Sequence, residues 1–134
     1  MRTFTTGATR DDATTKPSYC GFLSPRALKR FGQYMLVHQR QADGKLRASD
    51  NWKRGMPREE YLESLLRHTI DLWDEYERKG TWNEELECAI LFNAQGLLHE
   101  TMKEEEILDQ AMIFNAQVLR PRLLREMLKA ARRK

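Results

Sequence analysis

The stretch NEELECAILFNAQGLLHETMKEEEILDQAMIFNAQVL, residues 83–119, decides the fold. Its apolar residues recur every three or four positions, which is the period of an α-helix, and Asn83 suits the N-cap position. Thr101 and Glu104 have the spacing of a capping box, which predicts a second helix that restarts there. Because no proline or glycine stands at that junction, one helix over residues 84–118 is the alternative. The sequence leaves both interpretations open.

Helical signals also flank this stretch on both sides. Ser24 followed by Pro25 is a good cap and first turn for one helix. Pro57 predicts the start of another helix, which ends at Gly80. After Pro121 the apolar spacing predicts a final amphipathic helix. The patterns together predict an all-α protein, a small bundle of four to five helices.

The length of 134 residues suits one domain with one core. Residues 1–22 are rich in Thr, Gly and Asp and predict an irregular arm, followed by a helical core over residues 23–118. The glycines, aspartates and cations of residues 42–56 predict a loop, with a tight turn at Asp43-Gly44. Residues 120–134 are expected to form a basic C-terminal helix.

Charge is strongly divided along the chain. Residues 57–110 carry fifteen acidic and five basic side chains, whereas the rest carries five acidic and eighteen basic ones. Such segregation creates one field that concentrates cations and another that attracts phosphates or acidic partners. No stretch approaches the roughly 20 apolar residues that span a bilayer. Cys20 and Cys88 lie far apart, and no signal-like run precedes them, so we expect a cytoplasmic protein without membrane association.

A short internal repeat links the two halves of the central stretch. AILFNAQ at residues 89–95 returns as AMIFNAQ at residues 111–117. In each copy the asparagine, Asn93 or Asn115, shares a helical stripe with apolar residues, so both are expected to point inward. A buried amide needs a partner, and facing copies would supply one. Such a pair sets helix register or orients nearby carboxylates.

The repeat also carries acids onto acids. Glu84 and Glu87 form Glu-x-x-Glu, and Glu106 and Asp109 form Glu-x-x-Asp after eighteen intervening residues. Two such helices packed face to face present four carboxylates to one volume, which suits Mg²⁺. On one straight helix the pairs would stand roughly 33 Å apart. Solvated helix faces are the other explanation for acids at this spacing.

Several other residues are candidates for chemistry. The acids at residues 59–63 with Glu84 and Glu87 offer a second version of the metal site. His68, with Asp71 beside it, is a candidate catalytic pair for relaying a proton, although a lone histidine on a helix flank often has a structural role. The cations around Trp52 suit phosphates, and its ring suits a base. The predicted substrate-binding residues are Lys45, Arg47, Trp52, Lys53, Arg54, Arg67 and Asn93.

Five motifs within about residues 5–100 are similar to one family. They are TGAxR (6–10), YxGFLSPxxLxR (19–30), DNWxxGxP (50–57), RH (67–68) and AILFN (89–93). The chain thereby resembles a phage-encoded domain family labelled dATP/dGTP diphosphohydrolase, N-terminal. The combination of the third and fourth motifs is its more specific part.

The resemblance implies release of pyrophosphate from purine deoxynucleoside triphosphates, in phage nucleotide metabolism within the host cytoplasm. It suggests kinship with the all-α, MazG-type nucleotide pyrophosphatases, whose pattern is Glu-x-x-Glu followed at a distance by Glu-x-x-Asp. That would make Glu84, Glu87, Glu106 and Asp109, or the earlier acids, ligands of Mg²⁺ or Mn²⁺.

A non-enzymatic function is the alternative hypothesis. The basic C-terminal helix would bind nucleic acid or an acidic protein face. Its cations are Arg120, Arg122, Arg125, Lys129, Arg132, Arg133 and Lys134. The opposite charges of the two parts of the chain also suggest a homo-oligomer.

Overall fold

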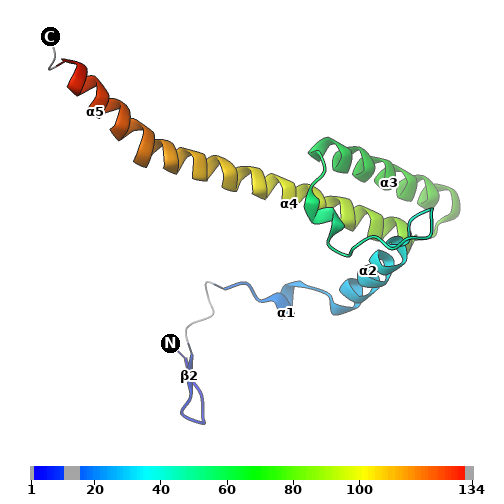
Figure 1. The fold of residues 1–134 in the computed structure, drawn as a ribbon. Coiled ribbons are helices and arrows are strands. Elements are labelled where there is room, and N and C mark those ends of the chain that lie inside the picture. The colour runs from blue at the N-terminus through cyan, green and yellow to red at the C-terminus, as the bar shows by residue number, and fades with distance from the viewer. Residues whose placement is uncertain (1, 11–15, 132–134) are drawn as a thin grey trace.

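Helices dominate the molecule, and one of them extends as a long rod from a small bundle (Figure 1). The computed structural model describes residues 2–10 and 16–131, so parts of the expected arm and of the basic helix, residues 1, 11–15 and 132–134, lie outside it. The elements are β1 Arg2–Thr3, β2 Thr9–Arg10, α1 Tyr19–Phe22, α2 Pro25–His38, the 3-10 turn η1 Asn51–Arg54, α3 Arg58–Lys79, α4 Glu84–Phe114, the π-helical turn η2 Asn115–Leu119 and α5 Arg120–Ala131. The predicted all-α class is confirmed.

The N-terminal arm contains more regular structure than its composition predicts. β1 and β2 form an antiparallel hairpin in which the Phe4 N–H donates to the Ala8 carbonyl at 2.8 Å. Gly7 turns the chain at a φ of 82°, which glycine adopts without steric cost. The expectation of an irregular arm over residues 1–22 was therefore wrong for this hairpin and for α1.

The predicted starts of α2 and α3 are confirmed. The Ser24 hydroxyl accepts a hydrogen bond from the Ala27 N–H at 3.2 Å, and Pro25 is the first residue of α2. Pro57 directly precedes α3, and Gly80 ends that helix at a φ of 67°. Each end therefore has a local cause: a side-chain acceptor, a preset φ, or a residue free to turn left-handed.

α4 is one continuous helix, so the predicted restart at Thr101 was wrong. The Thr101 hydroxyl donates to the Leu97 carbonyl at 3.0 Å. A residue inside a helix makes this contact, so Thr101 does not cap a new helix. The alternative of one long helix describes this region. Without a residue that breaks the backbone pattern, continuing the helix satisfies every internal N–H, whereas a restart leaves several without partners.

Pro121 does not end the helix. Proline has no N–H, and its ring would clash with the carbonyl four residues earlier. The chain accommodates it through η2, where the Arg120 N–H donates to the Asn115 carbonyl five residues back. The π turn widens the helix ahead of the ring, and α5 continues the rod (Figure 1).

The core lies where α3 packs on the first half of α4. Tyr61 of α3 is completely buried, and Cys88, Ala89, Asn93 and Gly96 of α4 are buried with it. From Met102 onward most side chains of the rod are exposed. Among the helices of the described residues, none is both long and apolar enough to cross a membrane.

Asn83 connects α3 to α4 through both ends of its amide. Its Oδ1 accepts from the N–H groups of Glu85 and Leu86 at 3.0 and 3.3 Å, and its Nδ2 donates to Glu75 Oε2 at 2.9 Å. This last hydrogen bond lowers the pKa of Glu75 below its ordinary value. Asn83→Ala is expected to reduce the free energy of unfolding by about 1 kcal/mol at pH 7, because an N-cap contributes roughly that much.

The pH dependence of the free energy of unfolding separates the two roles of Asn83, the N-cap of α4 and the hydrogen bond to Glu75. Because the folded pKa of Glu75 is lowered, its contribution is present above the unfolded value near 4.5 and is lost as the pH falls through the folded value. Asn83→Ser keeps a capping oxygen but has no amide donor. Urea denaturation at pH 7 should show that Asn83→Ser loses less free energy of unfolding than Asn83→Ala. Between pH 7 and pH 3, the stability of both variants should fall less than that of wild type. Equal stabilities of the two variants would contradict the capping role.

Candidate functional site

The predicted metal ligands do not converge within one chain. Glu84, Glu87, Glu106 and Asp109 all lie on α4, and corresponding members are displaced by 22 positions. That spacing is about 33 Å along a helix. Glu84 is paired with Arg30, and the other three side chains are exposed to solvent. The prediction that these four acids share an ion in one chain was therefore wrong, because it required a fold-back that α4 does not make.

The second set of acids is also dispersed. Tyr61 packs against Gly96, so the acids at residues 59–63 lie beside a part of α4 that is twelve residues beyond Glu84, about 18 Å along the helix. Across the residues that the structure describes, no three acidic, histidine or cysteine side chains come close enough to hold a metal ion. Among the described residues of one chain, the donor groups therefore do not gather into a site for Mg²⁺ or Mn²⁺.

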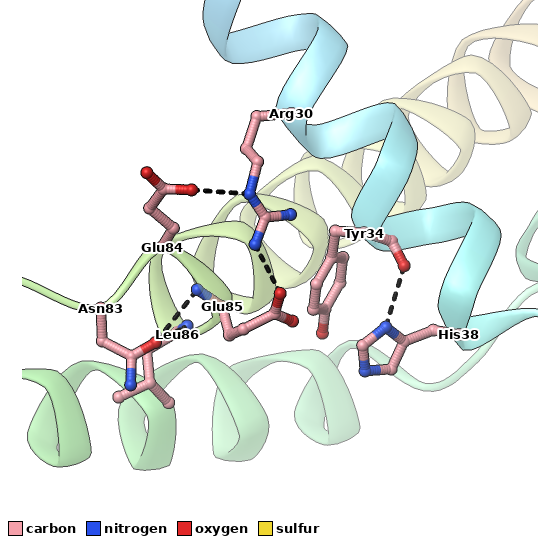
Figure 2. A network of polar contacts seen from close by, with 7 residues as sticks. All are labelled: Arg30, Tyr34, His38, Asn83, Glu84, Glu85 and Leu86. Atoms are coloured by element: carbon pink, nitrogen blue, oxygen red, sulfur yellow. Dashed lines mark hydrogen bonds and ion pairs between the residues drawn. The ribbon is translucent and has the colours of Figure 1, made fainter.

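Arg30 of α2 forms ion pairs with two acidic side chains at the start of α4, Glu84 and Glu85 (Figure 2). Its Nε donates to Glu84 Oε2 at 2.7 Å, and a second guanidinium nitrogen donates to Glu85. These hydrogen bonds raise the pKa of Arg30 above its ordinary value. The contact fixes α2 across the N-terminal turn of α4, next to Tyr34. Burial, followed by the charge of Glu85, raises the pKa of the Tyr34 hydroxyl.

A cleft of about 740 Å³ lies between α2 and the loop that follows it, and we name it the α2–loop cleft. The predicted tight turn is present in this loop: Gly44 has a φ of 81°, and the Lys45 N–H donates to Asp43 Oδ1 at 3.0 Å. The cleft is lined by Gly32, Tyr34, Met35, Leu36, His38, Gln39, Arg47, Ala48, Ser49, Asn51, Trp52, Arg54, Gly55, Met56 and Phe92. Its volume falls in the range of small-molecule sites, roughly 300–1,000 Å³.

Three of the predicted substrate-binding residues line this cleft: Arg47, Trp52 and Arg54. Both arginines are exposed, and among the described residues neither forms an ion pair. Trp52 is half-buried. Two guanidinium groups and an indole therefore share one concave surface that has no carboxylate in its lining. This combination suits an anion that carries a flat ring.

The other predicted residues lie outside the cleft. Lys45 pairs with Asp43 at 3.5 Å, Lys53 is exposed on the same turn as Arg54, and Arg67 donates to the Ser64 hydroxyl at 3.1 Å. None of these three cations lines the α2–loop cleft. They face solvent, so the structure does not bring these three predicted phosphate-binding residues to the cleft.

The predicted polar residues of the helices have local surroundings. The Nδ1 atom of His68 is buried without a hydrogen-bond partner in the described part of the chain, while Asp71 is exposed. Asn93 is buried, as predicted, and its Nδ2 donates to the Ala89 carbonyl of the same helix at 2.8 Å. Asn115 is exposed. The expected amide pair between facing copies was therefore wrong within one chain.

His38 is a cleft residue that the sequence analysis missed. Its Nδ1 lies 2.9 Å from the Tyr34 carbonyl, and its ring centroid lies 4.0 Å from that of Tyr34 (Figure 2). A carbonyl only accepts, so Nδ1 carries the hydrogen and donates it. In the neutral ring Nε2 is then the acceptor, able to take a hydrogen bond or a proton from a bound molecule. The i, i+4 spacing of Tyr34 and His38 was the available signal.

α4 supplies two further residues that the sequence analysis missed. The rings of His99 and Trp52 meet edge to face, with centroids 4.9 Å apart. Glu100 Oε1 lies 3.5 Å from the position that a Cβ on Gly55 would take, and the Glu100 side chain is only 14% exposed. These contacts attach the loop to α4. No local pattern reveals them, because the two segments are far apart in sequence.

α5 lies at the end of the rod away from α2 (Figure 1). Arg120, Arg122, Arg125 and Lys129 are exposed along it. Lys129 pairs with Glu126 at 3.0 Å. The remaining cations predicted for this helix, residues 132–134, lie outside the described residues.

Comparisons with models of protein families, with curated proteins and with solved structures found no match.

Proposed function

We propose that this protein binds a purine nucleoside triphosphate in the α2–loop cleft. The observation that supports this most directly is the position of Arg47, Arg54 and Trp52 on one concave surface. The resemblance of the DNWxxGxP segment to the dATP/dGTP diphosphohydrolase domain family points to the same ligand. Three of the residues that this motif specifies, Asn51, Trp52 and Gly55, line the cleft.

The two halves of a nucleotide match the two kinds of side chain in the cleft. Guanidinium groups form paired, charge-assisted hydrogen bonds with phosphate oxygens, and the two arginines have no competing carboxylate among the described residues. Met35, Met56 and Phe92 give the cleft an apolar wall next to Trp52. A purine gains stacking and burial there, whereas a free inorganic phosphate gains neither.

Pyrophosphate release is the reaction that we propose for the bound nucleotide, and the family resemblance alone supports it. Within residues 2–10 and 16–131, the carboxylates of one chain do not gather into a site for Mg²⁺ or Mn²⁺. The proposal therefore assigns binding to named residues and assigns no residue to the hydrolytic step.

Titration with dGTP and dATP, followed by calorimetry with Mg²⁺ present, tests the binding site. Arg54→Ala is expected to weaken nucleotide affinity about ten- to a hundredfold, because a charge-assisted hydrogen bond contributes about 1.5–3 kcal/mol. Trp52→Ala should weaken it by a similar factor through lost stacking. Lys53→Ala is the matched control: it removes a neighbouring cation of the same turn that does not line the cleft, so affinity should be retained.

Each outcome bears on the proposal. Wild-type protein that binds neither nucleotide would reject the site, and so would an equal effect of Arg54→Ala and Lys53→Ala, because bulk charge would then explain binding. Pyrophosphate release by the same samples is measured in parallel. Binding without release would leave a nucleotide-binding protein and would reject the hydrolase.

A further inference from the structure

The outer face of α3 carries a line of apolar side chains that the described part of the chain leaves largely uncovered. The side of α3 that contains Tyr61 packs on α4, and the line lies on another side of the same helix. Its spacings of three and four positions place its members on one face. We name it the α3 stripe. Its members are 42% to 65% exposed, and they are Leu62, Leu66, Ile70, Trp73 and Tyr76.

α5 has an exposed apolar face of the same kind. All of its members lie within one regular helix, Arg120–Ala131, so the period of 3.6 residues applies throughout. We name this face the α5 stripe. Its members are 52% to 69% exposed, and they are Leu123, Leu124, Met127 and Leu128. The cations of α5 that follow Pro121 lie on the opposite side of the helix, so α5 is amphipathic.

The charges of the two helices are opposite in sign. α5 contains four basic and one acidic side chains, a net charge of +3, whereas α3 contains seven acidic and four basic ones, a net charge of −3. Glu59, Glu63 and Glu77 lie along one edge of the α3 stripe. Among the described residues, these three acids form no ion pair, and neither do Arg122 and Arg125 of α5. An apolar face edged by carboxylates suits an apolar helix that carries cations.

One chain cannot bring its own two stripes together. α4, η2 and α5 form one continuous rod, and α3 lies beside only its first part (Figure 1). Tyr61 packs against Gly96, and Glu75 accepts a hydrogen bond from Asn83. α5 begins 24 residues after Gly96, which is about 36 Å along the rod. The α5 stripe therefore requires the α3 stripe of another molecule.

The length of the rod allows two copies to cover each other. The rod extends from residue 84 to residue 131, so its midpoint lies between residues 107 and 108. In an antiparallel pair that shares this midpoint, residues 120–131 of each rod lie level with residues 84–95 of the other. The same part of α4 lies beside residues 61–75 of α3, because of the contacts of Gly96 and Asn83. Both α5 stripes can therefore meet an α3 stripe at once, and the pair is closed.

We propose that the α5 stripe of each copy packs on the α3 stripe of a second copy, in a symmetric dimer of antiparallel rods. Burial of the two apolar faces stabilises the contact. Charge favours this pairing over α5 against α5 or α3 against α3, because each of those sets like charges together. No residue of either stripe lines the α2–loop cleft, and the inference does not depend on the proposed function.

Sedimentation of the full chain at micromolar concentration, without nucleotide or nucleic acid, tests the proposal. The expected mass is about twice 15.9 kDa. Leu66→Glu and Met127→Glu each place a charge in one stripe, and each should weaken dimerisation at least about a hundredfold, because both contacts of the dimer are affected. Gln95→Glu is the matched control and should stay dimeric. It adds the same charge to an exposed position of α4 about 200° round the helix from Asn93, which is buried under α3.

A mixture of the two variants distinguishes this pairing from self-pairing of one stripe. The Leu66→Glu protein keeps an intact α5 stripe, and the Met127→Glu protein keeps an intact α3 stripe. Together they should form a heterodimer with one intact contact, weaker than the wild-type dimer. Pairing of α5 with α5 would leave Leu66→Glu dimeric. That result would overturn the proposal, and so would a mixture that assembles no better than either variant alone.

Two spectroscopic measurements accompany these experiments. Circular dichroism shows whether each variant is still helical, and Met127→Glu decides the question if Leu66→Glu does not fold, because α5 lies outside the bundle (Figure 1). Trp73 belongs to the α3 stripe, so its fluorescence should shift to shorter wavelength as the wild type dimerises. A monomeric wild type would overturn the proposal, including the case in which it assembles only on added DNA or anionic vesicles. A dimeric Met127→Glu protein would overturn it as well.

Discussion

Gly96→Ala is expected to lower the free energy of unfolding by about 2–4 kcal/mol, a large share of a small domain's stability. α3 and α4 approach each other closely here. A Cβ at Gly96 would lie 2.5 Å from Cζ and 2.8 Å from Cδ1 of the Tyr61 ring, and that ring is completely buried. The ring has no free space into which it can move, so the helices must separate. The gain in helix propensity from alanine, about 1 kcal/mol, offsets only part of this cost.

Gly32→Ala is the matched control for this prediction. Gly32 is also a helical glycine, but it is exposed, and a Cβ there would meet nothing within 4 Å. Its replacement should stabilise the protein by up to about 1 kcal/mol. Urea denaturation at pH 7 followed by tryptophan fluorescence measures both. Two variants of equal stability would show that the contact with Tyr61 is not as close as described.

A double-mutant cycle tests whether the effect of Gly96→Ala comes from its contact with Tyr61. Tyr61→Leu removes the ring atoms that the new Cβ would meet. Combined with Gly96→Ala, it should cost less than the sum of the two single changes, because the clash no longer exists. Strictly additive effects would place the strain elsewhere in the α3–α4 contact.

Helix ends could be predicted from the sequence, because their causes are local. A serine with a proline after it, an asparagine before an acidic turn, and a glycine after two cations each act on backbone groups a few residues away. Whether α4 continues past Thr101 was harder to decide, because Thr101 and Glu104 match a capping pattern that the continuous helix leaves unused. The deciding factor was that no residue in this region stops a helix. A match to a capping motif does not take that absence into account.

The internal repeat shows why burial could not be predicted from spacing alone. Asn93 and Asn115 occupy the same place in nearly identical segments, yet Asn93 is buried under α3 and Asn115 is exposed. Helical periodicity indicates which residues share a face, whereas burial depends on whether another element covers that face. α3 is long enough to cover only the first copy. The prediction of a four-carboxylate site failed for the same reason.

Part of the candidate site was predictable because it lies in one loop. The cations and Trp52 of residues 42–56 stand close in sequence, and composition alone marks them as suited to an anion. His38, His99 and Phe92 reach the same region from other elements. Their contribution depends on how α2 crosses α4, which is fixed by the Arg30 contact with Glu84 and Glu85. Such long-range contacts leave no trace in residue spacing.

Tyr61→Phe is expected to raise the free energy of unfolding by about 1–3 kcal/mol at pH 7. The Tyr61 hydroxyl is buried and has no hydrogen-bond partner among the described residues, and leaving such a group unpaired costs about that much. Phenylalanine keeps the ring that fills the space against Gly96 and Phe92. The substitution therefore removes a polar cost without opening a cavity.

The pH dependence of stability provides an independent check on Tyr61. Burial, followed by the charge of Glu100, raises the pKa of the Tyr61 hydroxyl above the ordinary value of 10.0. A raised folded pKa means that this contribution is complete below about pH 10 and is lost as the pH rises through the folded value. Tyr61→Phe should therefore lose less stability than wild type between pH 9 and 11, roughly the range in which tyrosines ionise. The control Tyr19→Phe alters an exposed hydroxyl and should follow the wild-type curve. A Tyr61→Phe protein less stable than wild type at pH 7 would contradict the prediction and would reveal a hydrogen bond to this hydroxyl.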